Sequence, residues 1–141
     1  MKIQRSVWER IVRSVPRGYA ECGGLLGGRD HIVSTYVLDM GHSEMTMQDV
    51  YVPDTAFLNL VLRGWQRKGI ELLGFFHTHL SGNERLSKGD IRYIQRIMRA
   101  RHQTTDSLYF PIVLPGEKMI VYRADKKSKS VCIVSDSIEL L

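Results

Sequence analysis

The sequence predicts a single α/β domain, residues 1–141, in which a mixed and mostly antiparallel sheet of about six strands is flanked by about three helices. Apolar residues recur at helical spacing in three segments, and short runs rich in β-branched and aromatic residues are separated by turns that contain glycine or proline. A chain of 141 residues with 43% apolar content has the size and composition of one ordinary globular domain.

The three predicted helices lie at the start, in the middle and in the later part of the chain. The first spans residues 4–15 and ends at Pro16, and the second spans residues 54–68 and ends at Gly69. The third begins after Ser87, whose hydroxyl is suited to cap a helix N-terminus. Helices spaced in this way between antiparallel hairpins favour an α/β sandwich around a mixed sheet.

The predicted strands are short runs between turn signals. A hairpin is expected near the N-terminus, with a turn over residues 27–30. The strands of the sheet are expected at Leu25–Leu26, His31–Leu38, Val50–Val52, Ile70–Phe76, Ser107–Leu114, Met119–Arg123 and Ser130–Val134. Residues 70–76 are almost all apolar, which is typical of a buried central strand.

A short window that follows this central strand has the composition of a metal site. His77 and His79 are two residues apart, so on a strand their side chains share one face and can converge on one ion. Asp90 lies in the first turn of the helix that begins after Ser87, and its carboxylate can reach back to the histidines. Two imidazoles and one carboxylate suit zinc, with the fourth position left to water as in catalytic sites.

A hydrolytic zinc site also needs a general base that does not bind the metal. Glu21 is the candidate, because it is a lone acid that opens the small and apolar stretch up to Gly28. This stretch begins the first predicted hairpin strand. The base is therefore expected at a strand end.

These residues together resemble the JAMM or MPN+ metalloproteases, also called the JAB domain. The resemblance depends on a glutamate followed by small and apolar residues, then HxH, seven residues and SxxD. It implies a JAB/MPN-type sandwich with a cytidine-deaminase-like architecture and one Zn²⁺ per chain. It also implies His77, His79 and Asp90 as zinc ligands, Glu21 as the catalytic acid and base, and Ser87 as the residue that steadies the oxyanion. The family usually has proline after the second histidine, whereas this chain has Leu80.

The resemblance implies a zinc isopeptidase that hydrolyses the bond after the C-terminal glycine of a ubiquitin-like modifier, in deconjugation or precursor processing. Activating and conjugating enzymes of the same pathway would then be partners. One alternative is a hydrolase that releases an amino acid such as cysteine from the tail of a sulfur carrier. A non-catalytic MPN scaffold is a second. A zinc nucleobase deaminase is disfavoured, because its PCxxC motif does not occur.

Composition predicts which partners and which cellular compartment to expect. The net charge is +5, but the basic residues are not interleaved with aromatic ones, so no nucleic-acid partner is expected. No apolar run approaches the length of a membrane span, and the N-terminus lacks a signal sequence, so a cytoplasmic protein is expected. Cys22 and Cys132 form no CxxC pair, which argues against a disulfide framework or a zinc ribbon. The sequence leaves the oligomeric state open.

Overall fold

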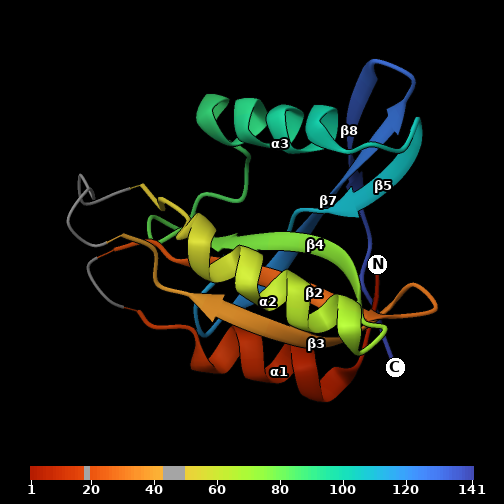
Figure 1. Cartoon of the computed structure of the whole chain (residues 1–141). Helices are drawn as coiled ribbons and strands as arrows, with labels where there is room; N and C mark the ends of the chain where they lie inside the picture. Colours follow the sequence, from red (N-terminus) through yellow and green to blue (C-terminus); the bar gives the residue numbers. More distant parts are fainter. Residues whose placement is uncertain (18–19, 43–49) are drawn as a thin grey trace.

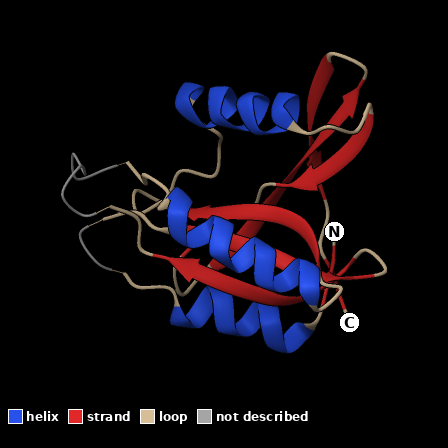
Figure 2. Cartoon of the chain, viewed as in Figure 1, coloured by secondary structure: helices blue, strands red, loops and turns tan. Residues whose placement is uncertain are grey.

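The structure is a computed structural model that describes residues 1–17, 20–42 and 50–141 (Figure 1). The described residues form three helices and nine strands, which Figure 2 shows as an α/β arrangement. The helices are α1 (Arg5–Ser14), α2 (Thr55–Arg67) and α3 (Lys88–Ala100). The strands are β1 (Lys2–Ile3), β2 (Gly23–Arg29), β3 (Ile32–Asp39), β4 (Glu71–Thr78), β5 (Thr105–Tyr109), β6 (Ile112–Leu114), β7 (Lys118–Lys127), β8 (Ser130–Asp136) and β9 (Glu139–Leu140).

The strands form one mixed sheet in the order β5-β7-β6-β4-β2-β3-β1-β9, with β8 paired to β7. Its longest ladders, β2–β3, β2–β4 and β7–β8, are antiparallel, whereas β4 runs parallel to β5 and β6. β4 therefore lies inside the sheet, with β2 on one side and β6 on the other. Its C-terminal end is the place where the two histidines leave the sheet.

The helices cover both faces of this sheet. α1 and α2 lie on opposite sides of the central strands, and α3 lies over the end of the sheet formed by β5, β7 and β8 (Figure 1). The α1 side holds the largest buried cluster, in which Val7 and Ile11 pack with Leu26 and Phe76. Phe75 faces the other way and packs partly against both the α2 and the α3 clusters. Because side chains alternate along a strand, His77 and His79 project from the same face as Phe75, which is the face that α2 and α3 cover.

The sequence predicted the three helices to within one residue at the ends that it defined, and it predicted the mixed sheet. The number of strands was underestimated, because β1 and β9 have only two residues each: β1 pairs with β3, and β9 pairs with β1. Strands this short carry no periodicity that could be recognised in the sequence.

Three details of the predicted strands were wrong. Residues 50–52 are not a strand but a connection, in which the carbonyl of Val52 accepts from the N–H of His42. The predicted strand 107–114 is divided into β5 and β6 at Pro111, which has no N–H to donate. The first hairpin turns at Asp30 and His31, both with positive φ, and not at residues 27–30 as a whole.

No helix among the described residues is both long enough and apolar enough to cross a lipid bilayer.

Candidate metal centre

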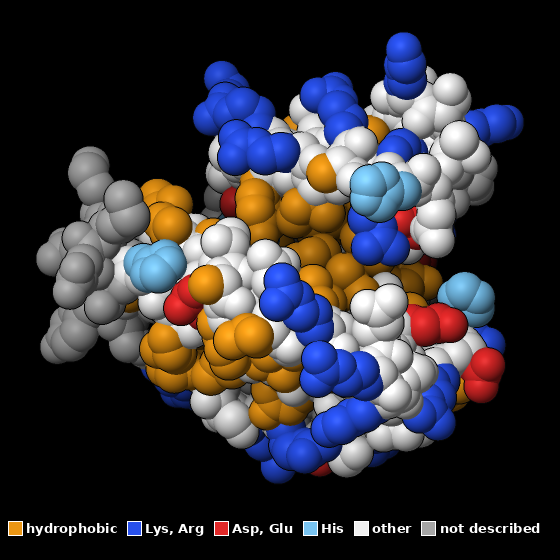
Figure 3. Space-filling model, viewed as in Figure 1, with side chains coloured by type: hydrophobic (Ala, Val, Ile, Leu, Met, Phe, Trp, Pro, Cys, Tyr) orange, Lys and Arg blue, Asp and Glu red, His pale blue; other side chains and the backbone are white. Residues whose placement is uncertain are grey.

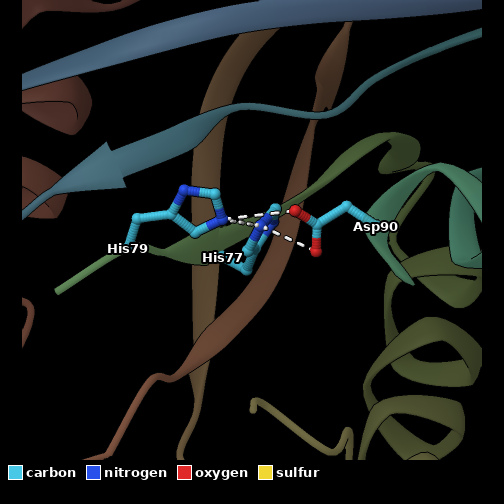
Figure 4. Close-up of side chains that lie close together, drawn as sticks. All are labelled: His77, His79 and Asp90. Carbon is cyan, nitrogen blue, oxygen red and sulfur yellow. Dashed lines mark hydrogen bonds and ion pairs between the residues drawn. The ribbon is translucent and has the colours of Figure 1, made fainter. Parts of the chain in front are cut away.

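β4 carries the two histidines to the edge of the α2 and α3 face. His77 pairs with Gly23 of β2 and Ile112 of β6, and the N–H of His79 donates to the carbonyl of Val113 at 3.1 Å. Strand geometry therefore continues through His79 on the β6 side. The two imidazoles project from the same face of the chain, with their ring planes inclined at 69° (Figure 4).

The first turn of α3 supplies the carboxylate. Ser87 is the N-cap: its Oγ accepts from the N–H of Asp90 at 3.0 Å, while the N–H of Ser87 donates to Oδ2 of Asp90 at 2.7 Å. This reciprocal pair is a capping box, which satisfies two N–H groups of the helix start. It also holds the carboxylate of Asp90 toward the histidines (Figure 4).

The three side chains converge to within hydrogen-bond distances. Nε2 of His77 lies 2.9 Å from Nε2 of His79 and 3.3 Å from Oδ1 of Asp90, and Nε2 of His79 lies 3.2 Å from Oδ2 of Asp90. In tetrahedral zinc sites with ligand distances of 2.0–2.1 Å, the ligand atoms are about 3.3 Å apart. The spacing of these atoms fits such a site.

A backbone carbonyl fixes the orientation of His79. Its Nδ1 lies 2.7 Å from the carbonyl oxygen of Asn83, and because a carbonyl only accepts, Nδ1 must carry the proton. In the neutral ring, Nε2 then has a lone pair that points toward His77 and Asp90. Metal-binding histidines are commonly oriented by such a bond from the other ring nitrogen.

The electrostatics of the group favour an ionised carboxylate. Burial alone raises the pKa of Asp90, but hydrogen bonds with His77, His79 and the Ser87 N–H outweigh it, so the pKa lies well below its usual range. Burial alone lowers the pKa of His79, yet the bonds with Asp90 and the Asn83 carbonyl leave it raised. A partly buried pair of imidazoles beside a carboxylate anion is a favourable place for a divalent cation.

A cavity of about 440 Å³ opens in front of these three side chains. Glu21, which lies two residues before β2, lines this cavity together with Ser87. Its charge contributes to the raised pKa of His79, which places Glu21 within electrostatic range of that imidazole. All five residues singled out in the sequence therefore surround one cavity.

The rest of the cavity wall is mainly apolar and aromatic. β4 contributes Phe75, and α3 contributes Tyr93 and Ile94. Phe110 comes from the connection between β5 and β6, and Tyr51 from the connection before α2. Figure 3 shows hydrophobic side chains gathered in the hollow below α3. A cavity of this size, lined by aromatic residues and a few convergent polar groups, is typical of binding sites for small molecules or peptide segments.

Sequence reasoning missed three parts of the site. The carbonyl of Asn83 acts through its main chain, so no residue type could reveal it. Tyr51 was assigned to a strand, and Tyr93 was not singled out. Tyr93 follows Asp90 by three residues on α3, so helical spacing alone indicates that the two share a face.

Comparisons with known proteins bear on the fold. No family model matches the chain, and no curated protein matches it. A solution structure of a protein from Desulfitobacterium hafniense is similar with a TM-score of 0.63 and 18% identity, covering 99% of this chain and 93% of that one. A solution structure of a protein from Salinibacter ruber has a TM-score of 0.57 and 17% identity, covering 100% and 92%. At these identities the similarity is one of fold alone: the chain shares its α/β fold with proteins of both organisms.

Proposed function

We propose that this protein is a zinc-dependent isopeptidase or peptidase of the JAMM or MPN+ type, with a JAB/MPN sandwich of cytidine-deaminase-like architecture. The observation that carries the proposal is the convergence of His77, His79 and Asp90 in a cavity that Glu21 also lines. A scaffold without catalysis needs neither a complete ligand set nor an acid beside it. The joint presence of both therefore supports an enzyme.

The residues present fit one zinc ion. Nε2 of each histidine and one carboxylate oxygen of Asp90 would bind it, which leaves a position open toward the cavity. When bound, zinc would lower the pKa of a coordinated water to about 7 and polarise a substrate carbonyl. The Asn83 carbonyl would keep the His79 ring turned with Nε2 toward the metal.

Glu21 is proposed as the acid and base of the reaction. Its carboxylate would accept a proton from the attacking water and deliver it to the nitrogen of the leaving amine. Its place on the cavity wall, outside the ligand group, suits that role. A metal ligand would be a much poorer base, because its lone pairs are directed at the cation.

Ser87 is proposed to hydrogen-bond the oxyanion of the tetrahedral intermediate. Its Oγ already accepts from the N–H of Asp90, but a hydroxyl also donates, so capping the helix leaves its own proton for the substrate. Ser87 lines the cavity with the ligands. The same side chain can therefore start the helix and contact the substrate.

The proposed substrate is the extended C-terminal tail of a ubiquitin-like modifier, cleaved after its terminal glycine in the cytoplasm. The apolar and aromatic cavity wall supports a peptide-like substrate. Activating and conjugating enzymes of the same pathway are proposed as partners. A sulfur-carrier protein with a terminal amino acid would meet the same catalytic groups, and its release reaction is the alternative.

The test uses the purified chain loaded with one equivalent of zinc and modifier proteins that carry a C-terminal aminocoumarin amide. We expect release of the fluorophore, loss of release after chelation, and recovery on adding zinc. Glu21→Gln should retain zinc and lose turnover. A metal-loaded protein with no activity on modifier or carrier substrates would overturn the proposal, and release of cysteine only from a carrier would favour the alternative.

A further inference from the structure

A row of three residues crosses the sheet beside the metal group. Asp39 of β3 and His77 of β4 both pair with Gly23 of β2, on its two sides. Residues directly opposite one another in a sheet project from the same face. Asp39 and His77 therefore flank a position that has no side chain, on the face where the cavity lies.

The ring of Tyr51 fills the space above Gly23. A methyl group added at position 23 would lie 2.4 Å from Cε1 of Tyr51, and one added at Gly41 would lie 3.3 Å from Cδ2 of the same ring. Both distances are shorter than ordinary contact, so the ring rests against two bare stretches of backbone. Tyr51 consequently stands between Asp39 and His77 and forms part of the cavity wall.

Asp39 holds this ring from behind. Its side chain is buried, with 3% of the residue exposed, and Oδ2 accepts from the Tyr51 hydroxyl at 2.5 Å. The same carboxylate accepts from the N–H of Gly41 and from the N–H of Asp54, each at 2.9 Å. Asp54 is in turn the N-cap of α2, where its side chain accepts from the N–H of Phe57.

One buried carboxylate thus joins the end of β3, the aromatic wall and the start of α2. Charge-assisted hydrogen bonds of this kind are the stronger ones in proteins. They leave the ring little freedom to swing out of the cavity. A rigid ring next to a ligand limits the size of what can lie beside it.

We propose that Tyr51 contacts the substrate and limits the size of the acyl-side residue next to the scissile bond, and that Asp39 is the positioning residue that holds Tyr51 in place. This inference rests on the proposed function, because it takes the cavity to be the place where the acyl part of the substrate binds. It adds a specificity role to two residues outside the five that carry the chemistry.

The experiment measures binding of two hydroxamates to the zinc-loaded protein by calorimetry: N-acetylglycine hydroxamate and N-acetylphenylalanine hydroxamate. A pocket wall that excludes a large side chain discriminates by tenfold or more. We expect the wild type to prefer the glycine compound at least tenfold. Tyr51→Ala should reduce this preference to below threefold, with one zinc per chain retained.

Asp39→Ala should reduce the preference in the same direction, and the double variant should add nothing further, since Asp39 acts through Tyr51. Tyr36→Ala is the matched control, because it removes a tyrosine ring from the α1 face, where Tyr36 packs with Phe76. It should keep the tenfold preference. If Asp39→Ala does not fold, Asp39→Asn and Tyr51→Phe weaken the same bond from either side.

Two results would overturn the inference. One is an unchanged preference in Tyr51→Ala, and the other is the absence of binding of both hydroxamates to zinc-loaded wild type. If Asp39→Ala lowers the thermal stability but leaves the preference between the two hydroxamates unchanged, Asp39 has only a structural role, and the inference is contradicted. Loss of the proposed function is distinguishable, since a zinc-loaded protein that shows the expected ratios but hydrolyses no amide would contradict only the enzyme assignment.

Discussion

The N–H of Ser87 donates to Oδ2 of Asp90 at 2.7 Å, so the bond that begins α3 also orients a proposed zinc ligand. Oδ2 is the same oxygen that faces Nε2 of His79. The same hydrogen bond therefore caps the helix and orients the proposed ligand. A substitution at Ser87 or Asp90 should affect both the helix start and the position of the carboxylate.

Substitution of a ligand is expected to remove the metal. His77→Ala and Asp90→Ala each delete one of the three proposed ligands, so the zinc content measured by elemental analysis should fall from about one per chain to below about 0.1. His102→Ala, on an exposed histidine after α3, is the control and should retain zinc. A native protein that contains no zinc when purified with the metal present would contradict the site.

Glu21→Gln is expected to separate catalysis from metal binding. The amide keeps the shape of the side chain but cannot accept the proton, so turnover should fall by about 10²–10⁴-fold with zinc content unchanged. Glu117→Gln changes an exposed acid in the turn before β7 and should behave as wild type. An active Glu21→Gln variant would exclude Glu21 as the base.

Ser87 can be tested for its two roles with two substitutions. Ser87→Ala removes the cap and should lower the free energy of unfolding by about 1 kcal/mol. Ser87→Asp keeps a cap acceptor, but its ionised carboxylate has no proton to donate, so it should keep nearly all the stability and still lose activity. Wild-type activity in Ser87→Asp would show that Ser87 only caps the helix.

Leu80→Pro introduces the residue that the JAMM family usually has after the second histidine. The N–H of Leu80 makes no hydrogen bond within the described part of the chain, and Leu80 is 38% exposed. A proline there costs no bond. We expect zinc content and urea midpoint close to those of wild type, and a loss of metal would show that the residue at position 80 affects the proposed site.

The Tyr51 cluster predicts how stability changes at alkaline pH. Burial, together with the bond to Asp39, raises the pKa of Tyr51, and burial raises that of Tyr93 to about 12. Unfolded tyrosine ionises near pH 10, so the folded state binds more protons above that pH. This stabilisation is complete below about pH 10 and is lost as the pH rises above it.

Urea midpoints measured from pH 8 to 12 would check this sign. The wild type should lose stability above pH 10, and Tyr51→Phe should lose less over the same range. Tyr51→Phe should also be less stable at pH 8 by about 1–3 kcal/mol, because Asp39 keeps its burial but loses one donor. If the urea midpoints of the wild type and of Tyr51→Phe fall in parallel as the pH rises, the raised pKa of Tyr51 is contradicted.

Much of the framework could be predicted from local pattern. Residues 54–68 and the segment after Ser87 carry helical periodicity, and the apolar run before His77 indicated a buried strand that ends at the histidines. These signals depend on residues close in sequence. The metal and the substrate remain predictions.

What escaped prediction depends on contacts between distant segments or on the main chain. Nothing near Tyr51 shows that Asp39 and Gly23 will surround it, because the sheet register that brings them together is set by other residues. Hydropathy predicts one strand over residues 107–114, whereas the structure has two strands separated at Pro111. The carbonyl of Asn83 has no residue-specific signal at all.

That carbonyl has a consequence for how the connection between the histidines and α3 can evolve. The oxygen of Asn83 orients His79, whereas residues 80–85 are all exposed. Selection for metal binding would therefore act on the path of the backbone and leave these side chains open to diversification. Relatives could present different surfaces to their substrates here while keeping the same histidine geometry.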